Sequence, residues 1–296
     1  MRLVKASYQI MAMSGFPELP YSYADSDRLI EAAGRTCYKS EDKITETSAK
    51  PFVEMLEKRT HFAMIEHSWE VRLYFGAELP KYPSPFLRSF SFYGDSIVVG
   101  NRTAFTEVEQ REDLPKGNYW LWSESAIRAF SEHYSHHLIL AMTVKFITDR
   151  GVSHELVRHR PCSFAQESTR YCNYKDGVAF IIPPWLDLPE GEFNNQDLIE
   201  FKAQRHLNDI ERRWLANRFR DEENYVDMLK FGWKSEQARG ELPTCLKTEI
   251  WVTAPVSQWR YMFYRRDDKA VHEQMRELMN PLHEEVKEKY PVYFGG

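Results

Sequence analysis

The residues best suited to chemistry lie close together, from His154 to Tyr174, with Arg150 just upstream. This stretch, HELVRHRPCSFAQESTRYCNY, is rich in side chains that bind anions. They are Arg150, His154, Arg158, His159, Arg160, Ser163, Gln166, Ser168 and Arg170. The whole chain has a formal charge of -5, so the stretch is a local excess of positive charge in an acidic protein. An anionic ligand would be bound by such a cluster and not by the surface as a whole.

A phosphate is the anion that suits these donors best. Ser168 and Arg170 offer a hydroxyl, backbone N–H groups and a guanidinium, and each charge-assisted hydrogen bond of this kind contributes about 1.5–3 kcal/mol. Arg158 and Arg160 flank His159 and would diverge if they lay on a helix, so one cluster could meet two groups of a ligand. The pattern therefore predicts a nucleotide site. A surface helix whose arginines pair with the many Asp and Glu residues is the competing interpretation.

Three other chemistries compete for the same stretch. His154 and His159 resemble the ligands of a zinc protease helix, but they are five residues apart where one helical face needs four. Cys162 and Cys172 could bind zinc with His159, yet nine residues separate the cysteines and leave no close pair. Ser168 lacks the glycines of a nucleophile elbow. The zinc protein stays open as an alternative.

A second group of potential metal ligands is His133, His136 and His137, on a helix expected from Tyr119 to His137. His133 lies about one helical turn from each of the other two. The sequence places no carboxylate or cysteine beside them, which favours ordinary helix positions. No metal site is predicted.

Composition sets further bounds. With 43% hydrophobic residues in a chain of 296, a substantial core can be buried and long disorder is not expected. The acidic charge argues against a general nucleic-acid-binding surface. The cysteines, widely spaced, are expected to be reduced thiols in a cytoplasmic protein. The opening MRLVKASYQIMAMSGFPE has no signal-peptide pattern, and no membrane span is expected.

The elements that must position the cationic stretch follow from periodicity and from turn residues. Strands are expected at VKASYQIM, Trp69–Phe75, the end of LILAMTVKFIT, VAFIIPP and LKTEIWVTA. Helices are expected at DRLIEAAGRTCY, Thr47–Lys58, Tyr119–His137, Asn194–Arg220, NYVDMLKFG, SEQARGELP and within Ser257–Lys289. We expect an α+β fold, a single compact domain over residues 1–296 with a central antiparallel sheet and a mostly helical C-terminal half.

One resemblance sharpens these expectations. RHRPCSFAQESTRY consists of RHR, seven residues, a serine, and Arg-Tyr two and three places later, and this resembles the signature of the flavin-dependent thymidylate synthases. Other segments are similar to the family's motifs in the same order: AAGRTCY, HFAMIEH (His61–His67), SEQARGELP (Ser235–Pro243) and WRYMFYRRDDKAVHEQMREL (Trp259–Leu278). The likeness leaves residues at about 77–135 unexplained, and they are expected to form an insertion with a strand or two.

The resemblance implies an enzyme that makes dTMP from dUMP. It would take the carbon from methylenetetrahydrofolate and reducing equivalents from NADPH through bound FAD, in a homotetramer whose active sites combine several subunits. Because reduced flavin would carry the difficult redox step, no protein nucleophile on the uracil is implied. Cys162 and Cys172 are then expected to be small buried side chains.

The same resemblance implies the site residues. For dUMP they are Glu155, Arg158, Gln166, Glu167, Ser168, Thr169, Arg170, Arg239 and Arg265. For FAD they are His61, Ala63, Arg158, His159, Arg160, Gln166 and Arg260. Two carry catalytic roles: Ser168 on the phosphate side, and Arg265, which would stabilise negative charge developing on the pyrimidine. Arg239 and Arg265 would arrive from the C-terminal region, of the same subunit or of another.

The sequence also departs from the family pattern, at Met64, Ala165, Gln166, Ala254 and Arg260. These departures motivate a near alternative, a flavin-dependent enzyme that modifies another pyrimidine nucleotide such as dCMP. A third hypothesis is a single-strand nucleic-acid binder that stacks bases on Tyr171, Tyr174 and Trp185. The net negative charge disfavours it.

Overall fold

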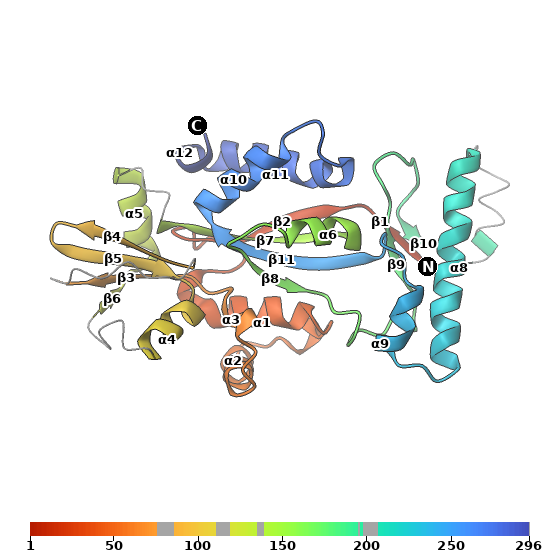
Figure 1. Ribbon diagram of the computed structural model, residues 1–296, viewed down its shortest axis with the longest axis horizontal. Coiled ribbons are helices and arrows are strands. Elements are labelled where there is room, and N and C mark those ends of the chain that lie inside the picture. The colour runs from red at the N-terminus through yellow and green to blue at the C-terminus, as the bar shows by residue number, and fades with distance from the viewer. Residues whose placement is uncertain (76–85, 111–118, 135–138, 195, 198–206, 296) are drawn as a thin grey trace.

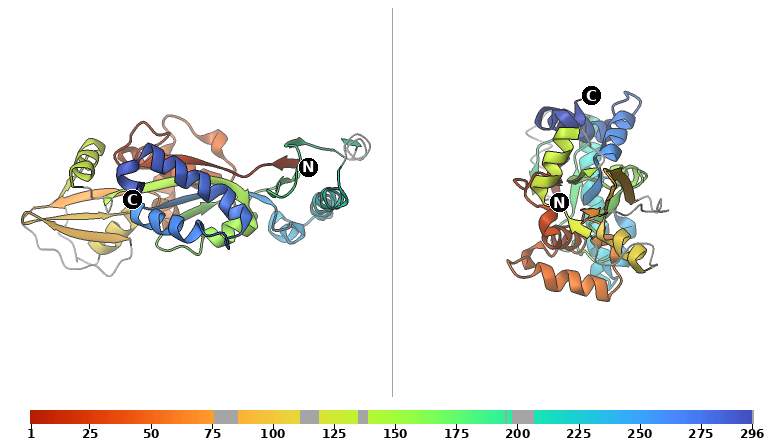
Figure 2. Two further views of the ribbon diagram at one scale, coloured as in Figure 1. Left: turned by 90° about the horizontal axis from the view of Figure 1, so that it is seen from above. Right: turned by 90° about the vertical axis from the view of Figure 1, so that its left-hand side faces the viewer.

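Three small β-sheets lie in a row in the computed structural model, and their row is the long axis of the molecule (Figure 1). The structure describes residues 1–75, 86–110, 119–134, 139–194, 196–197 and 207–295. Helices cover both faces of the middle sheet and flank the two outer sheets (Figure 2). The α+β class, the central antiparallel sheet and the mostly helical C-terminal half are confirmed. The single-domain organisation stays a prediction.

The middle sheet has the strand order β2-β7-β11-β8, and each neighbouring pair is antiparallel. Its strands are β2 (Ser7–Met13), β7 (Ala141–Asp149), β8 (Ser163–Gln166) and β11 (Lys247–Pro255). The two central strands are almost entirely buried, and they are rich in β-branched residues that pack well on a pleated surface. This sheet therefore holds the main hydrophobic core.

Different helices cover the two faces of the middle sheet (Figure 1). On one face lie α1 (Ser26–Thr36), α2 (Ala49–Lys58) and α3 (Phe62–Ile65). On the other face lie α6 (Arg150–Leu156), α10 (Val256–Arg266), α11 (Glu273–Lys289) and α12 (Pro291–Phe294). Side chains alternate along β7, so that Phe146 packs on Trp259 of α10 while Thr143 hydrogen-bonds Tyr23 before α1.

The sheet beside the N-terminus has the order β10-β1-β9. Its strands are β1 (Arg2–Val4), β9 (Ala179–Ile181) and β10 (Gly191–Glu192). It packs against α8 (Asp209–Lys230) through a separate core that includes Leu3, Phe180 and Tyr225. The chain then passes through α9 (Ser235–Ala238) and the short 3₁₀ helix η4 (Arg239–Glu241) into the middle sheet.

The third sheet, at the opposite end, has the order β4-β5-β3-β6. Its elements are β3 (Glu70–Tyr74), β4 (Leu87–Phe92), β5 (Asp95–Gly100), α4 (Arg102–Gln110), β6 (Tyr119–Leu121) and α5 (Glu124–Tyr134). The buried Arg72 joins them, because its guanidinium lies over Phe105 and pairs with Glu70 and Glu109. That residues 77–135 form an insertion stays a prediction.

Three expectations about local structure are wrong. The helix expected from Tyr119 begins only at Glu124, because Tyr119 to Leu121 pair with β3, and His136 and His137 lie outside the described residues. Asp209–Lys230 is one helix and includes the separately expected NYVDMLK, since no Gly or Pro interrupts it. It begins at a capping box on Asn208, and part of the expected Asn194–Arg220 helix lies outside the described residues. The helix α4 was not expected.

Further elements agree with expectation. The first strand divides into β1 and β2, and α1, α2 and β3 begin within three residues of their expected starts. The C-terminal helical region divides into α10 and α11 at Asp267–His272. Among the described residues, no helix is long and apolar enough to cross a membrane.

Trp259 anchors α10, the helix that carries Arg265, on the middle sheet. Its side chain is fully buried, and Nε1 donates to the Met142 backbone oxygen at 2.8 Å. We expect Trp259→Ala to lower the free energy of unfolding in urea by about 3–5 kcal/mol. Tyr261→Ala, two residues away on the exposed face of α10, should change it by no more than about 0.5 kcal/mol. Equal effects of the two substitutions would contradict this account.

Candidate active site

Residues of the cationic stretch form two groups, one at each end of the helix α6. It begins at Arg150 because Asp149 caps it, accepting the Val152 N–H at 2.7 Å. It ends at Leu156, and a turn then leads to β8. Arg150 and Glu155 are therefore separated by roughly 8 Å along the helix axis. The RHR triplet lies in the turn and is not helical, which corrects the helical geometry considered for it.

The N-terminal end of α6 brings two guanidiniums together. Arg150 is half-buried, and its Nη1 donates to the Glu167 backbone oxygen at 3.2 Å. Burial lowers the pKa of Arg150, and the positive charge of Arg239 acts in the same direction, although Tyr174 and Glu167 oppose it. A half-buried cation with the charge of a second guanidinium acting on it favours a bound anion.

Ser168 and Arg170 join this end through the loop after β8. The Ser168 hydroxyl accepts the Arg170 N–H at 3.3 Å, and the Arg170 side chain is exposed. Arg170 Nη2 lies 3.8 Å from Glu236 of α9, the helix that ends beside Arg239. The structure thus brings together the residues predicted for the phosphate, Ser168, Arg170 and Arg239, within one subunit. Thr169 occupies the turn between the first two.

The C-terminal end of α6 forms a second group around Arg266. Arg266 Nη1 donates to Glu155 Oε2 at 2.8 Å, and its Nε donates to His159 Nε2 at 3.0 Å. Arg265, Arg266 and Glu155 line a pocket of about 830 Å³ that also includes Tyr264 and His272. This pocket is large enough for part of a nucleotide or cofactor.

His159 is held neutral at this end. Burial lowers its pKa to about 4, and the charges of Arg266 and Arg265 contribute in the same direction. A neutral imidazole has one N–H donor and one acceptor nitrogen. At neutral pH, His159 is therefore a hydrogen-bonding group and not a cation.

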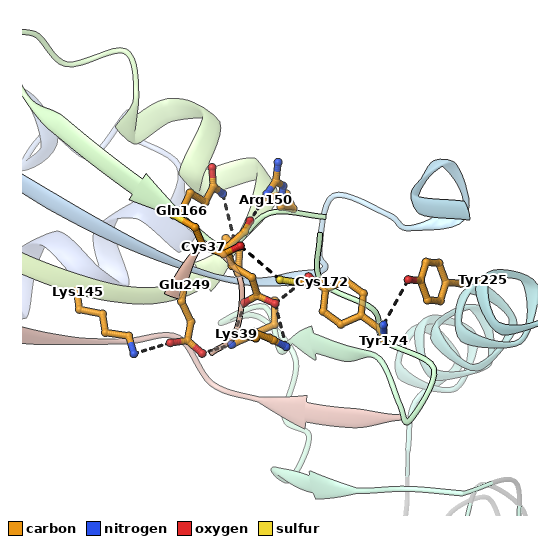
Figure 3. A network of polar contacts seen from close by, with 12 residues as sticks. Cys37, Lys39, Lys145, Arg150, Gln166, Cys172, Tyr174, Tyr225 and Glu249 are labelled. Carbon is orange, nitrogen blue, oxygen red and sulfur yellow. Dashed lines mark hydrogen bonds and ion pairs between the residues drawn. The ribbon is translucent and has the colours of Figure 1, made fainter. Parts of the chain in front are cut away.

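Gln166 and Glu167, both predicted to bind dUMP, point to opposite faces of the sheet. Gln166 ends β8 on the α6 side, where its Nε2 donates to Ser153 at 2.8 Å and to Thr248 at 3.2 Å. Glu167 is fully buried on the other side. Side chains alternate along an extended strand, so two successive residues cannot share one face. Figure 3 shows Gln166 and Arg150 on one side of the strands and Glu249 on the other.

Glu167 takes part in a network of ion pairs. Figure 3 shows Lys39, Lys145 and Glu249 of this network. Glu167 contacts Lys39 at 2.9 Å, Lys247 at 3.2 Å and the Tyr174 hydroxyl at 2.7 Å. Lys247 also pairs with Glu249, which contacts Lys145 at 2.5 Å. These contacts occupy both Glu167 oxygens and lend the residue a structural role on the face opposite Gln166.

The other residues predicted for FAD are dispersed. Arg158 and Arg160 are exposed in the turn beside His159. His61 and Ala63 are exposed in and beside α3, which packs against β8. Arg260 lies on α10, where its Nη1 donates to the Tyr293 backbone oxygen at 3.1 Å.

The surface-helix interpretation is wrong for these arginines. In the described part of the chain, no ion pair involves Arg158, Arg160, Arg239 or Arg265, and that of Arg170 spans 3.8 Å. These four exposed guanidiniums are therefore available to an external anion.

The zinc and nucleic-acid hypotheses also lose support. Cys162 packs in the main core and Cys172 in the N-terminal core, which confirms that both are small buried side chains. The described residues contain no cluster of three or more potential metal ligands. Of the three rings in the stacking hypothesis, Tyr174 is buried and bonded to Glu167 and offers no surface to a base, whereas Tyr171 and Trp185 are exposed.

Sequence reasoning placed Arg150 in the cationic stretch without giving it a role, and it missed Arg266. A role for Arg150 could have been inferred from its position directly after a buried strand and a capping Asp149. Arg266 follows Arg265, but its contacts to Glu155 and His159 bridge residues more than a hundred positions apart. No local pattern signals such contacts.

The fold and these unpaired arginines define an α+β protein with a cationic site on its middle sheet. The sequence profile of the family described as "Thymidylate synthase complementing protein" (Thy1) matches residues 105–292, more than half of the chain. The chain therefore belongs to this family. The match contains every predicted site residue except His61 and Ala63, and it begins inside the predicted insertion.

Curated relatives carry the name flavin-dependent thymidylate synthase. That of Corynebacterium diphtheriae is 30% identical over 150 residues, covering 49% of this chain and 56% of the relative. That of Saccharolobus solfataricus is 27% identical over 183 residues, covering 62% and 63%. The alignments thus span little more than half of these relatives' lengths.

Two solved structures are also similar. The UMP/dUMP methylase PolB from Streptomyces cacaoi, bound with 5-Br dUMP, is 16% identical with a TM-score of 0.45, covering 100% of this chain and 96% of that chain. Thymidylate synthase X from Helicobacter pylori, with FAD and dUMP, is 19% identical with a TM-score of 0.40, covering 65% and 89%.

The ion-pair network makes stability depend on pH. Burial raises the pKa of Glu249, but Lys247 and Lys145 outweigh it and lower the pKa from 4.5 to about 2. This carboxylate therefore stabilises the fold above pH 4.5, and the stabilisation is lost as the pH falls toward 2. Between about pH 6 and about pH 3, wild-type protein should lose roughly 2 kcal/mol more unfolding free energy than Glu249→Gln does.

Urea unfolding at a series of pH values measures this difference. Glu284→Gln is the matched control, because Glu284 forms an exposed pair with Lys287 on α11, and it should keep the wild-type pH dependence. If Glu249→Gln and wild type lost stability in parallel, the assignment to Glu249 would be wrong.

Proposed function

We propose that this protein methylates dUMP reductively to dTMP, with methylenetetrahydrofolate as the carbon donor and FAD reduced by NADPH. The observation that carries the proposal is the set of unpaired arginines at the two ends of α6, in a chain of the Thy1 family. A cytoplasmic homotetramer belongs to the same proposal, with other subunits completing each site. No protein nucleophile on the uracil is required.

The residues at the C-terminal end of α6 fit a flavin. Arg158 and Arg160 are exposed cations without ion-pair partners in the described residues, as an anionic cofactor requires. His159 is neutral and can hydrogen-bond a ring edge without adding charge. We assign FAD binding to them and to His61, Ala63, Gln166 and Arg260. When bound, FAD would supply the redox chemistry that amino acids lack.

The proposed roles for dUMP follow from charge and position. Arg170 and Arg239, with Ser168 and Thr169, bind the phosphate, and Arg150 adds positive charge behind them. Arg265 lies at the pocket near the other end of α6, where it stabilises negative charge developing on the uracil. Because roughly 8 Å separate the two ends, a nucleotide can extend from one to the other.

Glu155, Arg158, Gln166 and Glu167 complete the proposed dUMP site. Glu155 lines the pocket, whereas the Gln166 carboxamide lies beside α6. Glu167 would act through the loop it supports, because both of its oxygens already have partners.

The test combines flavin binding with turnover. Purified protein should take up FAD and become yellow, and it should release tritium from carbon 5 of labelled dUMP when folate and NADPH are present. Arg265→Ala should retain FAD but lose turnover by about a hundredfold or more, as expected for loss of a charge-stabilising group. Purified protein that takes up no FAD would contradict the proposal. Product analysis with dUMP and dCMP side by side decides between dUMP and another pyrimidine.

Arg170→Ala separates substrate binding from turnover. Loss of a charge-assisted bond to phosphate should weaken dUMP binding by about tenfold to a hundredfold in calorimetry. The long, exposed ion pair between Arg170 and Glu236 contributes little to stability. The free energy of unfolding should therefore fall by less than about 1 kcal/mol. Arg212→Ala, which breaks an exposed pair with Asp209 on α8, serves as the control. Unchanged dUMP affinity in Arg170→Ala would exclude a contact between Arg170 and the phosphate.

A further inference from the structure

The side chain of Arg266 hydrogen-bonds two residues of the proposed site, His159 and Glu155. Its Nε donates to His159 Nε2 at 3.0 Å, while Nη1 reaches Glu155 Oε2 at 2.8 Å and Nη2 reaches the Glu155 backbone oxygen at 3.4 Å. The carboxylate is only partly exposed, and the guanidinium is mostly buried. A planar guanidinium held at three points has little freedom to turn away from the imidazole.

This contact determines where the histidine carries its proton. Arginine is always protonated and can only donate, so the Nε2 atom that it contacts must be an acceptor with a free lone pair. An imidazolium has N–H groups at both positions and could not accept this bond. The single proton of a neutral imidazole must then reside on Nδ1.

The Nδ1 atom is available to a ligand. Among the described residues it makes no hydrogen bond, and it is not one of the fully buried polar atoms that lack partners. The ring itself is buried, with Arg158 and Arg160 on either side of it in the chain and Arg265 close by. Three acidic groups line the pocket beside this cluster. Arg266 engages Glu155, Asp267 contacts His283, and Asp268 accepts the Ala270 N–H.

We propose that Arg266 is a positioning residue that fixes His159 as the Nδ1–H tautomer, so that His159 donates a hydrogen bond to an acceptor atom of the bound cofactor. The flavin ring, with its carbonyl oxygens and ring nitrogens, is the class of ligand this donor suits. The choice of ligand rests on the proposed function, whereas the tautomer does not. His159 is a fixed donor and does not supply a proton at neutral pH.

The contact between Arg266 and His159 is tested first without any ligand. Exchange of the histidine C2 hydrogen, followed by mass spectrometry across a pH series, reports the pKa of His159 in the free protein. Wild type should titrate near 4. In Arg266→Gln the cation is lost and Glu155 is released beside the ring, so the pKa of His159 should rise, while burial and Arg265 still hold it below the usual value for histidine.

Arg212→Gln on α8 is the control and should leave the pKa of His159 unchanged, and circular dichroism checks that each variant is folded. A wild-type His159 that titrates near 6.5, or a folded Arg266→Gln in which its pKa does not move, would overturn the proposal. Arg266→Lys keeps one positive charge but can reach only one of the two partners, so its His159 pKa should lie between those of wild type and Arg266→Gln.

Two substitutions test which ring nitrogen of His159 donates, because each of them keeps an N–H donor near only one of the two nitrogen positions. The amide nitrogen of His159→Asn lies near the position of Nδ1, and that of His159→Gln near Nε2. Flavin fluorescence titration should give an FAD affinity for His159→Asn within about threefold of wild type, and a loss of roughly tenfold for His159→Gln. The reverse order would overturn the Nδ1 assignment. If wild type bound no FAD, the proposed function would fail, and the exchange experiment would still decide whether Arg266 holds His159 neutral.

Discussion

The antiparallel pairing of β7 with β11 is the constraint on which the rest of the site depends. Its register places Asp149 opposite Lys247 and Ala141 opposite Pro255. At the first end, the segments that leave β7 and enter β11 carry Arg150 and Arg239, which places these distant residues at the same end of the sheet. At the second end β11 continues into α10, which folds back over the sheet and brings Arg265 and Arg266 to the end of α6. One ladder thus assembles both halves of the site.

The same sheet separates two kinds of charge. Arginines without acidic partners in the described residues gather around α6, whereas Lys39, Lys145 and Lys247 are neutralised by Glu167 and Glu249 on the opposite face. The alternation of side chains along β8 and β11 is the cause. Because the paired charges satisfy one another, they add rigidity to the strands without competing for a ligand. The unpaired charges remain free to bind one.

The sequence alone predicted which residues belong to the site better than it predicted how those residues are arranged. Residue types and spacing sufficed to find the cationic stretch and its family resemblance, because those depend on the chain locally. Trp120 and Leu121 were assigned to a helix because their pairing with β3 involves residues almost fifty positions away. The opposite directions of Gln166 and Glu167 needed the strand to be known, and the contacts of Arg266 needed the whole fold. Tertiary pairing, which no local propensity encodes, decided each case.

The proximity of Arg150 and Arg239 has a thermodynamic consequence. Burial of the Arg150 guanidinium against a backbone oxygen is the main cause that lowers its pKa and the stability of the folded chain, and repulsion from Arg239 adds a smaller contribution in the same direction. A doubly charged phosphate would convert this repulsion into attraction on both sides, so binding and folding are linked through one pair of side chains. Natural selection could relieve the repulsion with a single acidic residue, but that residue would occupy the place of the ligand. The folded chain is thus less stable because its anion site is already formed before the ligand binds.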